Sequence, residues 1–214
     1  LESVHLNNKS VYSQEKHLYL GQAYFQIGQK ENNIRLLEKA EDNLKKALTI
    51  KGQDYYDAIK TLGAIAYKKN NYDLALQYSQ SIIDKKDEEF ILPLVLDEAN
   101  KTCAKVYMKR GEFAEAKEYL DNIKQEEIYN ALIVRYYYST KQYDECIKLI
   151  LSILNTCSGD DVNYYLPHLI NSYMRIGEID RARYYFDILI EEFTSKYKER
   201  FEGIYRLLKG LPIS

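Results

Sequence analysis

One short pattern recurs five times along this 214-residue chain, and it limits the fold more than any other feature. The full pattern is a large apolar residue, then a tyrosine, a glycine, an aromatic residue and an alanine, and the weaker copies depart from it at some of these places. The clearest copies are CAKVYMKRGEFAEA, which begins at Cys103, and LINSYMRIGEIDRA, which begins at Leu169. Weaker copies begin at Leu20, Leu62 and Ile133. Such a repeat predicts one continuous stack of similar supersecondary units.

The spacing of apolar residues inside the units predicts helices. Between Tyr72 and Ile83, apolar or small side chains recur every three to four residues, which places them on one face of a helix. The chain has only three prolines and nine glycines, as long helices require. We therefore expect five pairs of helices. Their predicted ranges are 15–27 with 33–50, 55–69 with 72–85, 91–109 with 113–123, 127–139 with 143–154, and 161–176 with 179–193.

Small residues at fixed places in the unit predict close contacts between helices. Gly63, Ala104, Ala116 and Ala182 would let the two helices of a hairpin approach each other, while aromatic residues fill the space between hairpins. Neither helix can bury its apolar face alone, so each hairpin needs a neighbour. We therefore assign residues 1–13 to an N-terminal cap or linker, residues 14–194 to five hairpins, and residues 195–214 to a C-terminal capping helix and tail.

The period of the repeat resembles that of the tetratricopeptide repeat (TPR) family, which is about 34 residues. The resemblance covers nearly the whole chain, although the chain has no tryptophan and no proline closing each unit. It implies an all-α fold, a right-handed α-solenoid of antiparallel helix hairpins. The residues at the alanine place of the five units are Ala40, Ala75, Ala116, Cys146 and Ala182.

Composition narrows the function classes. Thirty basic and thirty-two acidic residues give a net charge of -2, which predicts no bulk attraction to nucleic acid or to an anionic membrane. The longest apolar stretch, residues 90–96, is far shorter than the roughly 20 residues that cross a bilayer. The first ten residues do not resemble a signal peptide, so we expect a cytoplasmic protein. The chain begins at Leu1 rather than methionine, which leaves room for a targeting segment or a further domain before it.

The sequence offers no recognisable constellation for catalysis. His5, His17 and His168 lie far apart, and none stands at helical spacing from a cysteine or another histidine. Cys103 and Cys146 fall at packing positions, where a thiol acts as a small hydrophobic group. We therefore expect no enzyme activity, no catalytic or metal-binding residues and no cofactor.

The TPR resemblance implies that the first helices of successive hairpins line a concave groove. Counted from the apolar residue that leads each unit, the groove positions are two before it, two after it, and five or six after it. They carry positive charge interleaved with aromatic residues and methionine, which predicts a protein or extended peptide as partner, with an acidic segment favoured. The predicted groove residues are Lys60, Tyr67, Lys68, Lys101, Lys105, Met108, Lys109, Arg135, Tyr138, Asn171, Met174 and Arg175.

A known TPR binding mode does not match these residues. TPR proteins that grip chaperone tails hold a carboxylate with lysine, asparagine and arginine side chains from three hairpins. In this sequence, the matching places do not carry that set, so the resemblance does not predict chaperone docking. The residues at those places are Leu18, Gln22, Thr61, Glu98 and Thr102.

Three functions are compatible with the pattern. The first is a non-catalytic protein- or peptide-binding module that acts as a scaffold or adaptor. The second is the ligand- or peptide-sensing domain of a larger transcriptional or signalling regulator. The third, a nucleic-acid-binding helical repeat, is less favoured because the overall charge gives it little support.

Overall fold

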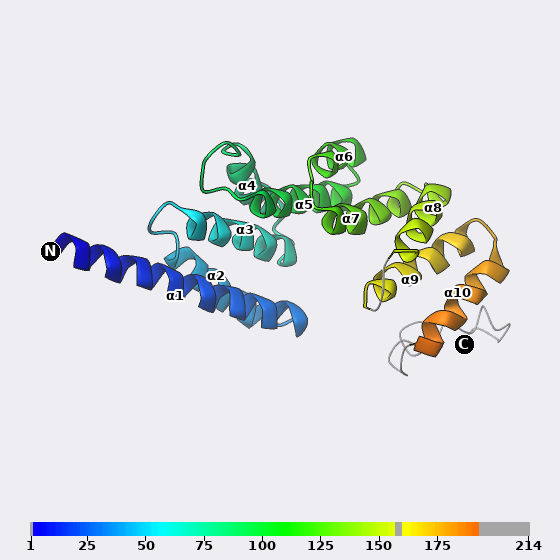
Figure 1. The fold of residues 1–214 in the computed structure, drawn as a ribbon, viewed down its shortest axis with the longest axis horizontal. Helices are drawn as coiled ribbons and strands as arrows, with labels where there is room; N and C mark the ends of the chain where they lie inside the picture. Colours follow the sequence, from blue (N-terminus) through cyan, green and yellow to red (C-terminus); the bar gives the residue numbers. More distant parts are fainter. Residues whose placement is uncertain (1, 157–159, 193–214) are drawn as a thin grey trace. The chain divides into compact units, whose positions relative to one another are not determined.

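The computed structural model describes residues 2–156 and 160–192, and within these ranges the chain is helical, with short connections and no β-strand (Figure 1). The all-α class predicted from the sequence is confirmed. The helices follow one another as five consecutive pairs across the described ranges. They are α1 (Glu2–Lys30), α2 (Ile34–Lys46), α3 (Gln53–Lys68), α4 (Tyr72–Ile83), α5 (Pro93–Arg110), α6 (Phe113–Asp121), α7 (Glu126–Ser139), α8 (Tyr143–Leu154), α9 (Asp160–Arg175) and α10 (Ile179–Glu192).

Several helix bounds differ from the predicted ranges, and two of the starts do so for identifiable reasons. Helix α1 begins at Glu2 rather than at residue 15, because residues 2–14 contain no proline or glycine that would stop a helix. Most of the segment assigned to a cap or linker, residues 1–13, therefore continues the first helix. Helix α5 begins at Pro93 rather than at residue 91, because a proline disfavours helical geometry in the residue before it. The predicted C-terminal cap, residues 195–214, lies outside the described residues.

The chain forms two compact units, Leu1–Tyr129 and Asn130–Ser214. The first contains α1 to α6, and the second contains α8 to α10. Helix α7 begins at the end of the first unit and continues into the second. No helix in the described part of the chain is both long and apolar enough to cross a membrane.

Close helix contacts in the first unit depend on small residues. A Cβ atom added at Gly21 would lie 2.5 Å from Leu44 Cγ, so α1 and α2 approach as closely as a glycine permits. A Cβ atom added at Gly63 would lie 3.2 Å from Ser79 Oγ, where α3 meets α4. Ala75 and Ala116, which the repeat places against a neighbouring helix, have no exposed surface. The packing role predicted for small residues in the unit is therefore confirmed at these positions.

Two buried polar side chains hold the segments that lead from one hairpin to the next. Gln14 of α1 is 5% exposed, and its side-chain amide exchanges two hydrogen bonds with the backbone of Ile50, at 3.0 and 3.1 Å. Asp97 of α5 is 2% exposed, and its carboxylate accepts hydrogen bonds from the backbone N–H groups of Lys124 and Gln125, at 3.0 and 2.8 Å. In these two hairpins, the first helix thus holds the linker that follows the hairpin.

A third contact of this kind joins α3 to the loop after α4. The hydroxyl group of Tyr56, which is fully buried, donates a hydrogen bond to Glu88, and Lys51 Nζ lies 2.9 Å from the same carboxylate. These two contacts, that from Tyr56 first, hold the pKa of Glu88 below its usual range. Hairpins one, two and three are therefore each tied to the linker that follows them.

The second unit has its own apolar core. Its largest fully buried side chains include Ile150 of α8, Leu166 and Leu169 of α9, and Phe186 of α10. The rings of Tyr173 and Tyr185 stack with centroids 5.7 Å apart. The core therefore comes from α7 to α10, so α9 is held on two sides by its neighbours.

Replacing Asp97 tests the importance of the linker contacts. We expect Asp97→Ala to lower the free energy of unfolding by about 1–3 kcal/mol, because two backbone N–H groups lose a charged acceptor. Urea unfolding followed by circular dichroism measures the change. The matched control is Asp121→Ala, which removes a half-exposed carboxylate that pairs with Lys117 one turn away and should cost less than about 0.5 kcal/mol. Equal losses for the two variants would contradict the assigned role of Asp97.

Candidate partner-binding groove

A groove of about 640 Å³ lies on the first unit, lined by the first helices of three successive hairpins. Helices α1, α3 and α5 lie side by side and run in the same direction (Figure 1). The helices fold this way because each buries its opposite face against the second helices, so the remaining face lies open. The predicted residues on this groove are Lys60, Tyr67, Lys68, Lys101 and Lys105. Met108, which is half-buried, and Lys109, which is exposed, lie farther along α5 and do not line it.

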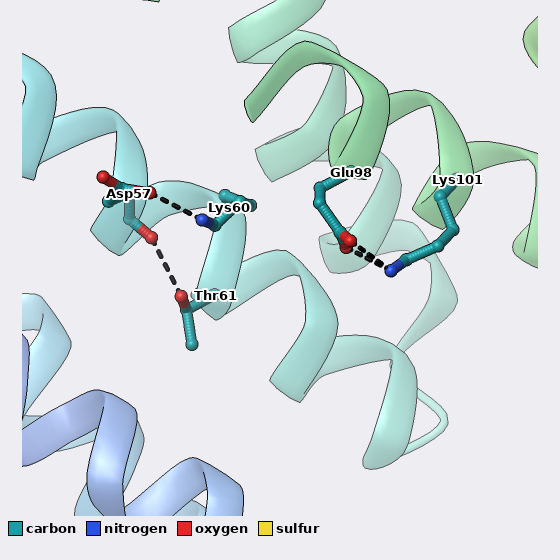
Figure 2. Close-up of polar contacts among 5 residues, drawn as sticks. All are labelled: Asp57, Lys60, Thr61, Glu98 and Lys101. Carbon is teal, nitrogen blue, oxygen red and sulfur yellow. Dashed lines mark hydrogen bonds and ion pairs between the residues drawn. The ribbon is translucent and has the colours of Figure 1, made fainter. Parts of the chain in front are cut away.

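Acidic residues partly neutralise the lysines of the groove. Lys60 Nζ lies 2.5 Å from the carboxylate of Asp57, and Lys101 pairs with Glu98 in the same way, three residues earlier on the same helix (Figure 2). The lining carries four lysines and one glutamate, a net formal charge of +3, which Asp57 reduces further. The repeat offsets alone did not reveal these pairs, although an acid three residues before a lysine is a recognisable signal.

Lys68 and Lys105 form the more strongly basic end of the groove. Lys68 is exposed and makes no ion pair with any described carboxylate. Lys105 Nζ lies 5.3 Å from the ring centroid of Tyr67, within the range of a cation–π interaction. Because α3 and α5 run in the same direction, these side chains gather at the carboxyl ends of the two helices. Unlike Lys60 and Lys101, neither has an acidic residue three positions before it on its helix.

The opposite end of the groove is apolar. Tyr19 of α1 and Leu94 of α5 line it and are 64% and 44% exposed. Phe90 and Leu92, just before α5, are also exposed, at 47% and 41%. The groove therefore has one apolar end and one basic end, a polarity that counting groove positions did not predict.

Helix α1 contributes a row of glutamines that the predicted set lacked. Gln22, Gln26 and Gln29 line the groove, together with Phe25. The offsets used for the other units, counted from Leu20, point to Gln22, Phe25 and Gln26. The signal was therefore present in the sequence, in the irregular first copy of the repeat.

Four of the five positions that correspond to the carboxylate-binding residues of other TPR proteins also line this groove. Gln22, Thr61, Glu98 and Thr102 all line it, whereas Leu18 is buried. The hydroxyl groups of Thr61 and Thr102 donate to carbonyl groups one turn earlier on their own helices, at 2.9 and 3.0 Å. Their oxygens can still accept a hydrogen bond from a ligand. These positions thus line the groove, but their chemistry differs from that of a carboxylate clamp.

The predicted residues of the second unit lie on α7 and α9. Arg175 Nε donates to the hydroxyl oxygen of Tyr138 across a long 3.5 Å distance, so these two predicted residues are in contact. Asn171 and Met174 are half-buried on α9, and Met174 packs against the core of the unit. Arg135 lies on α7, and its positive charge acts on His168 of α9.

Two residues of α9, His168 and Tyr164, lie beside these predicted residues but were not in the predicted set. The ring of His168 lies between those of Tyr138 and Tyr164, with centroid distances of 6.1 and 5.7 Å. Burial, and secondly the charge of Arg135, hold the pKa of His168 below its ordinary value. Burial also raises the pKa of Tyr164, which Arg135 partly offsets. Histidine spacing along the sequence could not reveal this cluster, because its members come from two helices.

The cysteines that the structure describes occupy packing sites. Cys103 and Cys146 have no exposed surface, and burial raises the pKa of the Cys103 thiol to about 12. Burial raises the pKa of Cys146 as well. Both therefore stay neutral thiols, which are poor nucleophiles. Among the described residues, no group of three or more histidine, cysteine, aspartate or glutamate side chains is placed to hold a metal ion.

Comparison with solved structures identifies the fold. Two crystal structures of nearly identical TPR-like repeats of a kinesin light chain from Podosopora anserina match with TM-scores of 0.59 and 0.57. Both are 15% identical to this sequence, and each match covers 82% of this chain and 92% of the other. A search of protein-family models finds no match, and neither does a search of curated proteins. The chain therefore has a TPR-like repeat fold, as its repeat predicted.

The depressed pKa of His168 predicts how stability depends on pH. The unfolded chain takes up a proton at this histidine at a higher pH than the folded chain does, so the folded state loses stability as pH falls below about 6.5. We expect the unaltered chain to lose stability relative to His168→Gln between about pH 7.5 and pH 5. Urea unfolding at several pH values measures the difference. Arg135→Gln removes one of the two causes that lower the pKa of His168, so it should reduce this pH dependence. If stability varies with pH in the same way in all three proteins, His168 is not the group responsible.

Proposed function

We propose that this TPR-like repeat chain is a non-catalytic scaffold or adaptor module that binds an extended, acidic segment of a partner protein in the groove of α1, α3 and α5. The fold supports a general role in protein interaction. The proposal that the partner segment is acidic and extended rests on the groove itself, which combines a net positive lining with one apolar and one basic end.

The groove has side chains suited to an extended backbone. The backbone groups within helices are bonded to one another, so recognition must come from side chains. Each amide of Gln22, Gln26 and Gln29 can donate to a carbonyl group and accept from an N–H group. Thr61 and Thr102 add acceptors on the facing helices. An extended peptide, whose backbone groups are not bonded internally, would satisfy these side chains.

The two ends of the groove favour a segment with an apolar residue at one end and acidic residues at the other. Tyr19 and Leu94 offer exposed apolar surface, and removing it from water would contribute binding energy. Lys68 and Lys105 would pair with carboxylates at the opposite end. Glu98 disfavours a nucleic acid, whose backbone carries a negative charge at every phosphate.

Charge reversal at the basic end tests the site. We expect Lys68→Glu with Lys105→Glu to weaken binding of a labelled peptide, one with a leucine at one end and glutamates at the other, at least about 10-fold, because two attractive charges become repulsive. Fluorescence anisotropy measures the affinity. The control is Lys46→Glu with Lys148→Glu, which changes the net charge equally on two exposed second-helix positions. No binding by the unaltered chain at millimolar peptide, or equal weakening by both variants, would reject the proposal.

Neutralising the acidic residues should have the opposite effect. We expect Asp57→Asn with Glu98→Gln to strengthen binding of the same peptide about 3- to 10-fold, because Lys60 and Lys101 are released from their ion pairs. The matched control is Asp73→Asn with Asp121→Asn, which releases Arg110 and Lys117 away from the groove. If affinity rises equally in both variants, overall charge rather than the groove governs binding.

A further inference from the structure

A second cluster of basic and aromatic side chains lies on α7 and α9 of the second unit. Helix α7 supplies Arg135 and Tyr138, which stand three residues apart and so share a face. Helix α9 supplies Tyr164, His168 and Arg175. The charge of Arg135 acts on His168 and on Tyr164. The ring of His168 lies near those of Tyr138 and Tyr164, and the Tyr138 hydroxyl group contacts Arg175. The cluster therefore has one arginine whose charge acts on the histidine and a second arginine in contact with the neighbouring tyrosine.

The two arginines are not neutralised by the described residues around them. Neither Arg135 nor Arg175 lies within 4.0 Å of a carboxylate among the side chains that the structure describes. In the same unit, Arg181 and Arg183 do have carboxylates within this distance, from Glu178 and Asp180. The contact of Arg175 with Tyr138 uses one of its five N–H groups and is long, at 3.5 Å. Donors for a ligand therefore remain on Arg135, which is half-buried, and on Arg175, which is exposed.

We propose that Arg135, Tyr138, His168 and Arg175 form an oxyanion site that prefers a phosphate monoester to a carboxylate. A guanidinium group offers paired donors that match two oxygens of such a group. Two arginines carry more positive charge than one carboxylate neutralises, whereas a phosphate monoester carries about 1.5 to 2 negative charges at neutral pH. Asn171, three residues after His168 on α9, adds an amide donor to the same face.

Protonation of His168 couples to this site. The groups that act on its ring are the rings of Tyr138 from α7 and Tyr164 from α9, together with the positive charge of Arg135 from α7. Without an anion, burial and the charge of Arg135 favour the neutral imidazole. A bound oxyanion offsets that repulsion and favours the protonated form, which gains a second donor. Anion binding and proton uptake by His168 therefore reinforce each other.

The test is a pH titration of the histidine ring signals by NMR, with and without millimolar inorganic phosphate. The chain has three histidines, and His17, which bonds to Asn43 in the first unit, serves as an internal control. We expect phosphate to raise the titration midpoint of His168 and to leave that of His17 unchanged. Acetate at the same ionic strength should shift His168 less. Equal shifts at both histidines, or equal effects of acetate and phosphate, would overturn the proposal.

Two variants separate an anion site from a merely structural cluster. Arg135→Gln should raise the midpoint of His168 in the absence of phosphate and abolish its response to phosphate. Arg175→Gln should weaken phosphate binding about 10-fold, the loss expected for one charge-assisted contact. Lys148→Gln, which removes an exposed charge on α8, is the control and should bind as the unaltered chain does. A normal phosphate response in Arg175→Gln would count against the site.

The source of the phosphate is tested with peptides. A phosphoserine peptide that shifts His168 more than its unphosphorylated form does would indicate a phosphorylated partner, whereas a response to inorganic phosphate alone would indicate a free anion. Both results support the site, and a response to neither overturns it. The proposal does not depend on the groove of the first unit, because the acidic peptide defined for that groove should bind Arg175→Gln with unchanged affinity.

Discussion

The architecture depends on one constraint, which is that no helix here can hide its apolar face without a neighbour. Close approach within a hairpin requires small residues, and Gly21 shows the limit, since even a methyl group there would meet Leu44. Stacking of hairpins requires in addition that each linker leave its hairpin at a fixed place. Hydrogen bonds from the first helices to the following linkers meet this requirement, and they are made by Gln14, Tyr56 and Asp97. Apolar packing thus supplies the stability, and these polar contacts determine where the next hairpin begins.

This division of roles leaves the first helices with one face that the fold does not need. On α1, α3 and α5, that face is polar and aromatic, and its residues are half-buried or exposed except for Thr61 and Thr102. A surface freed from packing can vary in charge without loss of the fold, whereas a larger side chain at Ala75 or Ala116 would overpack the core. Function in such a repeat is therefore expected on this face, and core residues such as Cys103 contribute only by positioning it.

The sequence predicted the helix pairs well because periodic burial leaves a periodic pattern. The same period selected one face of the first helices, and five of the seven residues named on the first unit line one groove there. Their role in binding a partner stays a prediction. Charge was predicted less well, because counting positions from the apolar leader ignores neighbours on the same helix, such as Asp57 beside Lys60. The start of α1 was misplaced because no proline or glycine between Glu2 and Gln14 stops the helix. Contacts between helices, such as that of His168 with Tyr138, leave no local signal at all.

The two proposed binding faces differ in the chemistry of their positive charges. On the first unit, the cations are lysines, two of them tied to carboxylates one turn away, and the lining is rich in glutamine. On the second unit, the cations are arginines set among tyrosine rings, with a histidine whose charge responds to its surroundings. Lysine acts as a flexible point charge, and it suits a long segment that needs approximate neutralisation. Arginine imposes a planar geometry, and it suits a compact group with several oxygens. A chain that repeats one fold can therefore carry two unlike recognition surfaces, because the repeat determines where the side chains lie but not what they are.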